Sequence, residues 1–318
     1  MIKANSANEA WIKILRALKA EGDEVSPRGL KIKEIRNCSV CIMEPKKRLI
    51  TNPIRQMSLP YAFGELIWYL TGDNKLETMQ YYSKRMKNFS DDGETLNSAY
   101  GYRIFGKHEK IGFDQWENVV RLLKEDRDSR QAIVHLHTPN NQKTKDEVCT
   151  LTLQFMIRHD KLEMFVNMRS NDVVWGFTYD MFNFTVIQEL IANELGIEIG
   201  PYYHNAASMH IYEKDWNMLE DIEKYADELE YIYPRFDFEF SMNGLTLKDP
   251  QLLRLFKIEE DYRLNGPASG RHTFDYNDTL TKIADILFKY SSYKRGLALE
   301  YKYDDVFDLM FMSHLVAK

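Results

Sequence analysis

The stretch from Gln131 to Tyr212 constrains the fold of this chain most, because strand-like runs surround one long apolar helix within it. Up to Met168 we expect a strand, a polar loop over Pro139–Glu147, and two strands joined by a turn at Arg158–Lys161. The strand-like runs are rich in apolar and β-branched residues, and polar turn residues separate them. This part of the chain therefore predicts a β-sheet.

A helix and further strands follow. Apolar residues recur at helical spacing over Met181–Leu195, and Gly196 follows as a C-terminal stop. Strands over Ile197–Tyr203 and through His210-Ile211-Tyr212 would rejoin the sheet. The order of these elements predicts one sheet whose strands are connected through a helix.

The N-terminal part adds two helices and a strand. Asn8–Ala20 has the spacing of an amphipathic helix, and Leu30–Met43 alternates apolar and polar residues after a turn at Ser26–Gly29. Leu59–Leu70 is apolar on nearly every side, which suits a buried helix, and Glu65 lies inside it. A carboxylate in such a helix needs a partner or a function.

The C-terminal part has a different pattern. Leu252–Tyr262 and Tyr276–Tyr290 are expected to be helical. We interpret the chain as a single domain with a core over about 25–235 and an extension over 236–318 of unknown role.

Composition excludes several classes of protein. With 318 residues, 44% of them apolar, the chain can bury a sizeable core, and its net charge of −6 argues against a general nucleic-acid surface. No apolar run approaches the roughly 18 residues of a membrane span. The N-terminus lacks the apolar core of a signal peptide. We therefore expect a cytoplasmic protein that binds neither membrane nor nucleic acid, with its three cysteines reduced.

Cys149 is the cysteine with the setting of a nucleophile. It stands where a polar loop enters an apolar strand, although a cysteine viewed alone is more often a small buried hydrophobe. Cys38 and Cys41 have the spacing of half a zinc site, but no second pair follows. We interpret them as strand residues and expect no metal.

Four short motifs carry a resemblance to a known family. They are Glu147-Val148-Cys149-Thr150, Met168-Arg169-Ser170-Asn171-Asp172, Gly176-Phe177-Thr178-Tyr179-Asp180 and Met209-His210-Ile211-Tyr212. In this order and spacing the chain resembles the thymidylate synthase family, from roughly Arg28 to Tyr212. The resemblance implies an α/β fold with a large mixed sheet flanked by helices, a helical C-terminal addition, and a homodimer.

The resemblance implies three catalytic residues. Cys149 would add to C6 of a pyrimidine nucleoside monophosphate, so that C5 attacks the one-carbon unit of 5,10-methylenetetrahydrofolate. Glu65 would order water and relay protons, and Tyr100 would assist removal of the C5 proton.

The resemblance also implies a set of binding residues. They are Arg28, Arg130, Arg169 and Ser170 for the phosphate, His210 and Tyr212 for the sugar 3′-hydroxyl, and Asp172 for the folate. The arginine matching Arg130 acts in the neighbouring subunit's site. Structural alternatives stay open: Glu65 could pair with an arginine, Arg130 could belong to an ordinary turn, and His210 could be a core histidine.

Asp180 indicates which base is bound. Family members that methylate uracil carry asparagine here, and the branch that hydroxymethylates cytosine carries aspartate. A carboxyl group can accept from the cytosine amino group and, when protonated, donate to N3. Thr150, where methylating enzymes carry histidine, agrees with this interpretation. The alternative is a structural bond of Asp180 in a diverged uracil enzyme.

Departures from the family pattern favour water as the final reactant. Gln131 replaces an arginine and Ala207-Ser208 replaces Gly-Asp, so phosphate binding must be rebuilt in part. Around Met86 and Phe89 the two tryptophans of methylating enzymes, which lie against the folate and the transferred carbon, are absent. Losing that aromatic shield would admit water, so we expect 5-hydroxymethylation of dCMP or CMP. The alternatives are a thymidylate synthase that methylates dUMP and a catalytically silent nucleotide- or RNA-binding homologue. The presence of Cys149 with Glu65 and Tyr100 argues against the silent homologue.

Overall fold

The computed structural model describes residues 1–318 except 53, 56, 140–143, 227–236, 276, 302–304 and 317–318. Its internal contacts form two compact units. Unit 1 comprises Met1–Gln56, Gln115–Thr138 and Val148–Phe240, and unit 2 comprises Met57–Asp114, Pro139–Glu147 and Ser241–Lys318. Nearly all of the expected C-terminal extension thus belongs to unit 2.

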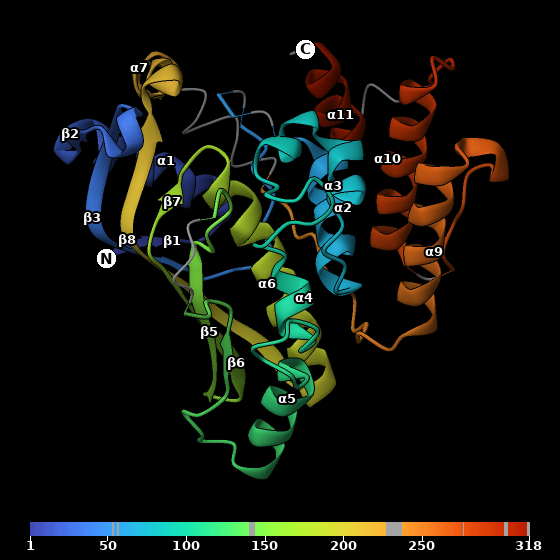
Figure 1. The fold of residues 1–318 in the computed structure, drawn as a ribbon, viewed down its shortest axis with the longest axis horizontal. Helices are drawn as coiled ribbons and strands as arrows, with labels where there is room; N and C mark the ends of the chain where they lie inside the picture. Colours follow the sequence, from blue (N-terminus) through green and yellow to red (C-terminus); the bar gives the residue numbers. More distant parts are fainter. Residues whose placement is uncertain are drawn as a thin grey trace. The chain divides into compact units, whose positions relative to one another are not determined.

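Unit 1 is built on a mixed sheet with the strand order β1-β3-β8-β6-β5-β4, to which β2 adds beside β3 and β7 beside β8 (Figure 1). The strands are β1 (Ile2–Ala4), β2 (Asp23–Val25), β3 (Ile32–Ile42), β4 (Ile133–His135), β5 (Thr150–Arg158), β6 (Lys161–Met168), β7 (Asn171–Asp172) and β8 (Glu198–Tyr212). The helices of this unit are α1 (Ala7–Glu21), α5 (Gln115–Glu125), α6 (Gly176–Leu195) and α7 (Asn217–Lys224). The predicted mixed sheet flanked by helices is confirmed.

Strand β8 is one continuous strand, so the prediction of two separate strands was wrong. It pairs antiparallel with β3 along one edge and parallel with β6 along the other. The middle of β8, Asn205-Ala206-Ala207-Ser208, has little intrinsic strand preference. Pairing with β3 on one edge and, up to Ala206, with β6 on the other keeps it extended nevertheless, because strand preference depends mainly on the surroundings.

Helix α6 begins at Gly176 rather than at Met181 as predicted, so Asp180 lies inside the helix. The first turns are not strong helix formers, and burial of Phe177 and Tyr179 outweighs that weak preference. Gly196 ends the helix with a φ of 67°, a left-handed conformation that suits glycine, as predicted.

Unit 2 consists mainly of helices (Figure 1). They are α2 (Leu59–Leu70), α3 (Leu76–Tyr82), α4 (Tyr100–Ile104), α9 (Pro250–Leu264), α10 (Asp278–Lys294) and α11 (Val306–Val316). The predicted bounds of α2 are confirmed, as are the two C-terminal helices α9 and α10, although Tyr276 lies outside the described residues. Helix α11 was not predicted.

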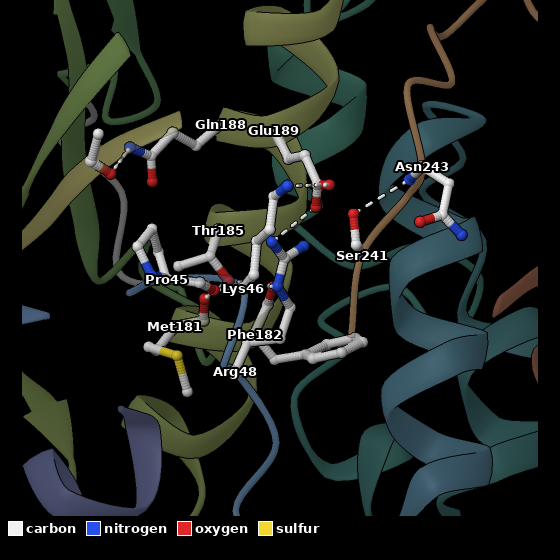
Figure 2. A network of polar contacts seen from close by, with 11 residues as sticks. Pro45, Lys46, Arg48, Met181, Phe182, Thr185, Gln188, Glu189, Ser241 and Asn243 are labelled. Atoms are coloured by element: carbon white, nitrogen blue, oxygen red, sulfur yellow. Dashed lines mark hydrogen bonds and ion pairs between the residues drawn. The ribbon is translucent and has the colours of Figure 1, made fainter. Parts of the chain in front are cut away.

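A buried ion pair joins Arg48, in the segment that follows β3, to Glu189 of helix α6. Arg48 Nη2 lies 2.7 Å from Glu189 Oε2, and both side chains are buried. Arg48 Nε also donates to the Pro45 carbonyl at 3.0 Å, and Lys46 Nζ lies 3.9 Å from Glu189 Oε1. Figure 2 shows both cations converging on Glu189. A carboxylate this deeply buried is tolerated because its charge is matched.

Arg48→Met should therefore lower the free energy of unfolding by about 3–5 kcal/mol, since Glu189 would lose its closest cation. Urea denaturation measures this change. The double variant Arg48→Met with Glu189→Leu should recover most of the loss, because no charge then stays buried.

The matched control is Arg121→Met in the exposed pair of Arg121 and Glu125, whose Nη1–Oε2 distance is also 2.7 Å. Its cost should stay below about 1 kcal/mol. Equal costs for the two arginine variants would contradict the role given to burial.

Candidate active site

Cys149 lies one residue before β5 and is half-buried, which confirms the predicted junction of loop and strand. Arg169 Nη2 lies 3.4 Å from its Sγ atom. The arginine is held in place because its Nε donates to the Val148 carbonyl at 2.9 Å and its backbone N–H donates to the Cys149 carbonyl at 2.9 Å. A cation beside the sulfur favours the thiolate, which is the reactive form.

The other two cysteines lie in a different environment. Cys38 and Cys41 are buried in β3, as the prediction of strand residues requires. Burial raises the pKa of the Cys38 thiol to about 11 and also raises the pKa of Cys41. Both thiols therefore stay protonated at neutral pH and are poor nucleophiles.

His210 and Tyr212 lie two residues apart on β8, so their side chains lie on the same face. Their ring centroids are 5.1 Å apart, edge to face. Burial lowers the pKa of His210 and raises the pKa of Tyr212, whose hydroxyl is hydrogen-bonded by Arg28. Both rings are therefore neutral near pH 7 and can serve as hydrogen-bond partners for a hydroxyl group.

Asp172 lies beside this pair because β7 runs parallel to β8, with Asp172 opposite His210. Its carboxylate accepts from the backbone N–H groups of Val174 at 3.1 Å and Trp175 at 3.3 Å. Burial raises the pKa of Asp172 to about 6. The side chain therefore titrates just below neutral pH.

Asp180 projects from α6 toward the same strands. Its Oδ2 accepts a hydrogen bond of 2.7 Å from Asn171 Nδ2. Burial raises the pKa of Asp180 to about 7, and the negative charge of Asp172 acts in the same direction. At neutral pH this carboxyl group is therefore present in both protonation states, one with a donor and one without.

Trp175 and Arg55 form a feature that the sequence interpretation missed. The indole of Trp175 is 38% exposed, and the Arg55 guanidinium lies 5.2 Å from its ring centroid. Arg55 is held by the Val174 carbonyl, to which its Nε donates at 2.7 Å. In the sequence, this feature was indicated by an arginine close to a predicted buried helix. That pattern is too common to indicate a site.

Seven of the predicted site residues are connected by contacts or electrostatic interactions within unit 1. These residues, here called the cluster, are Arg28, Cys149, Arg169, Asp172, Asp180, His210 and Tyr212. Arg130 and Ser170 belong to the same unit, but among the described residues no side-chain contact connects them to the cluster. Arg130 is exposed, and its carbonyl accepts from Gln154 Nε2 at 2.8 Å.

The two remaining predicted residues belong to unit 2. Glu65 is 8% exposed within α2, and its Oε1 accepts from the Tyr61 hydroxyl at 2.8 Å. Tyr100 begins α4 and packs against Tyr69 with a centroid distance of 5.5 Å. Gly101 makes this packing possible, because a Cβ atom there would lie 1.9 Å from the Tyr69 carbonyl oxygen.

The described residues contain no group of three or more His, Cys, Asp or Glu side chains placed to hold a metal ion. Within the same residues, no helix combines the length and the apolar character needed to cross a bilayer.

The sequence profile of the family described as Thymidylate synthase matches residues 11–262. The chain belongs to the thymidylate synthase family. The match includes all residues of the cluster as well as Glu65, Tyr100, Arg130 and Ser170. It also extends past residue 235, where we expected the family core to end.

Three phage proteins are similar to this chain, and each is named deoxyuridylate hydroxymethyltransferase. The one from Bacillus phage SP01 is 35% identical over 230 residues, which cover 68% of this chain and 60% of that protein. Those from Pseudomonas phage M6 and Delftia phage PhiW-14 are 31% and 27% identical, over 56% and 59% of this chain. The match spans only 51% and 55% of their respective lengths.

The contact between Arg169 and Cys149 predicts selective alkylation. In the wild-type protein Cys149 should react with iodoacetamide before Cys38 and Cys41, as measured by peptide mass spectrometry. Arg169→Gln should slow the reaction of Cys149 roughly threefold to tenfold near neutral pH, because the thiolate loses a neighbouring cation.

Arg127→Gln is the matched control, since this arginine is exposed and pairs with Asp160. It should leave the rate unchanged. An Arg169→Gln rate equal to the wild-type rate would show that the guanidinium does not activate the thiol.

Proposed function

We propose that this protein transfers a one-carbon unit from 5,10-methylenetetrahydrofolate to C5 of a pyrimidine nucleoside monophosphate and releases the 5-hydroxymethyl nucleotide. The observation that carries the proposal is the half-buried Cys149 with a guanidinium 3.4 Å from its sulfur, within the cluster. Family membership supports the one-carbon transfer. The names of the three phage relatives support a hydroxymethyl product.

The thiolate of Cys149 adds to C6 of the base, which makes C5 nucleophilic toward the one-carbon unit. The C5 proton then leaves, and elimination of the folate gives an exocyclic methylene. Water adds to that methylene, and release of the Cys149 sulfur restores the aromatic base. We propose that Tyr100 assists removal of the C5 proton and that Glu65 orders water and relays protons.

Separate sets of residues are proposed to bind the phosphate and the sugar hydroxyl of the nucleotide. Arg28, Arg169 and Ser170 would hold the phosphate, since guanidinium groups form paired hydrogen bonds with phosphate oxygens. His210 and Tyr212 would bind the 3′-hydroxyl, which suits two neutral side chains on one face of a strand. Arg28 next to the Tyr212 hydroxyl supports placing phosphate and sugar side by side.

The residues around Asp172 fit a folate. The exposed indole of Trp175 offers a flat apolar surface for a fused ring, and the buried Arg55 guanidinium lies against this indole. Asp172 would contact the ring through its carboxyl group, whose pKa of about 6 allows it to accept and donate. The folate would supply the transferred carbon.

Asp180 supports cytosine as the base. A carboxyl group with a pKa of about 7 can supply an acceptor to the N4 amino group and, when protonated, a donor to N3. The second candidate is hydroxymethylation of dUMP, because the three relatives are named for deoxyuridylate. Methylation of dUMP and a catalytically silent homologue are the other outcomes that an assay can show.

A homodimer is proposed because Arg130 is exposed and lies outside the cluster of its own chain. One face of the sheet also suits an interface. Phe165 and Tyr203 stack there with centroids 4.5 Å apart and are only half-buried, whereas the alternate residues Met164 and Tyr202 are fully buried. Location in the cytoplasm stays a prediction.

Mass spectrometry of the products from dCMP, CMP, dUMP and UMP with methylenetetrahydrofolate tests the reaction and the base. We expect a gain of CH2O on a cytosine nucleotide and no product from Cys149→Ser, which should still bind nucleotide. Cys38→Ser is the matched control and should stay active. A gain of CH2 would mean methylation, and a product from uracil alone would favour the second candidate.

Mixing Arg130→Ala with Cys149→Ser subunits tests the dimer. Each variant alone should be inactive, whereas hybrid dimers should recover activity, since one of their sites combines an intact Cys149 with the neighbour's intact Arg130. Hybrids verified by mass spectrometry that stay inactive would remove Arg130 from a shared site.

A further inference from the structure

Asn171 is the residue beside the cluster that received no role from the sequence motifs. It lies in β7, is 3% exposed, and contacts Asp180 through the 2.7 Å hydrogen bond from Nδ2 to Oδ2. The same Nδ2 atom lies 3.0 Å from Met168 Sδ. Gly176 leaves room for this amide, because a Cβ atom there would lie 3.0 Å from Asn171 Nδ2.

The amide can hold only one orientation toward an ionised Asp180. Both hydrogens of Nδ2 have an acceptor, Asp180 Oδ2 and Met168 Sδ. Rotation of the amide by half a turn would place Asn171 Oδ1 against a carboxylate oxygen, and two acceptors repel each other. Oδ1 itself is buried and has no hydrogen-bond partner among the described residues.

This orientation decides where a proton can reside on Asp180. As long as Nδ2 donates to both Met168 Sδ and Asp180 Oδ2, Oδ2 accepts from Asn171 and a proton on the carboxyl group is directed to Oδ1. Asp180 then presents one fixed acceptor, Oδ2, which retains a second lone pair, and one fixed donor, Oδ1–H.

To discriminate between cytosine and uracil, the carboxyl group must present its donor and its acceptor in a fixed order. Cytosine presents a donor at N4 and an acceptor at N3, and uracil presents an acceptor at O4 and a donor at N3. A carboxyl group whose proton moves freely between its oxygens can match either pattern. A carboxyl group with its proton held on one oxygen matches only one of them.

We propose that Asn171 is a positioning residue that holds the proton of Asp180 on one oxygen and thereby makes the enzyme selective for one pyrimidine base. This inference rests on the proposed function, because it assumes that Asp180 contacts the base. Two further titratable groups act on Asp180, namely Asp172 of β7 and the buried Tyr202 of β8.

The test is the ratio of kcat/KM for a cytosine nucleotide to kcat/KM for the matching uracil nucleotide. Asn171→Leu keeps nearly the same volume and removes the amide. It should bring this ratio roughly tenfold closer to one, through a gain on the disfavoured base. Asn171→Ser, which is smaller, should do the same and serves if the leucine variant does not fold.

A second readout follows from the hydrogen bond itself. Asn171 lowers the pKa of Asp180, so Asn171→Leu should move the corresponding step in the pH profile of kcat/KM to higher pH. Thr185→Val is the matched control for loss of a buried hydrogen bond in α6, since its hydroxyl donates to Met181 and Phe182 carbonyls. It should change neither the ratio nor the pH profile.

Asp180→Asn separates failure of this inference from failure of the proposed function. An asparagine matches the edge of uracil, so this variant should invert the preference. No turnover of any pyrimidine nucleotide by the wild type would overturn the proposed function, and an unchanged ratio in Asp180→Asn would overturn the assignment of Asp180 to the base on which this inference rests. An altered ratio in Asp180→Asn together with an unchanged ratio and pH profile in both Asn171 variants would overturn the role of Asn171 alone.

Discussion

The hydrogen-bond ladders on both edges of β8 are the constraint on which the rest of unit 1 depends. Strand β6 pairs with β8 from Glu198 to Ala206 and β3 pairs with it from Tyr202 to Tyr212, so together they fix its direction and register. His210 and Tyr212 lie near its end, and β7 aligns Asp172 with that same end. A shift of one residue in this register would turn both rings to the opposite face of the sheet.

Most of the fold could be predicted from periodicity. Helix α2 matched its predicted bounds, because apolar residues between Ser58 and Gly72 leave little choice of ends. The start of α6 could not be predicted, since Gly176 and its neighbours become helical only through packing. The continuity of β8 was missed for a similar reason: its polar middle is extended through pairing with strands that are distant in sequence.

The candidate site, like the fold, could be predicted from the sequence only in part. The family resemblance, carried by four short motifs and their spacing, predicted the site residues, and the structure brings seven of the side chains together in unit 1. Spacing carried no information on the bond between Asn171 and Asp180 or on the stacking of Arg55 with Trp175, because both depend on where β7 ends and α6 begins. The roles of all the predicted site residues, including Arg130 and Ser170, rest on the family resemblance.

The two acidic side chains of the cluster also lower the stability of the folded chain, because burial raises their pKa values. The pKa of Asp180 rises from 3.8 to about 7, and the pKa of Asp172 rises from 3.8 to about 6. The folded chain therefore holds protons that the unfolded chain has released, and its stability falls as the pH rises from about 4 to 7. A ligand that gives these carboxyl groups hydrogen-bonding partners would return part of that free energy. Nucleotide binding and resistance to unfolding should thus be linked.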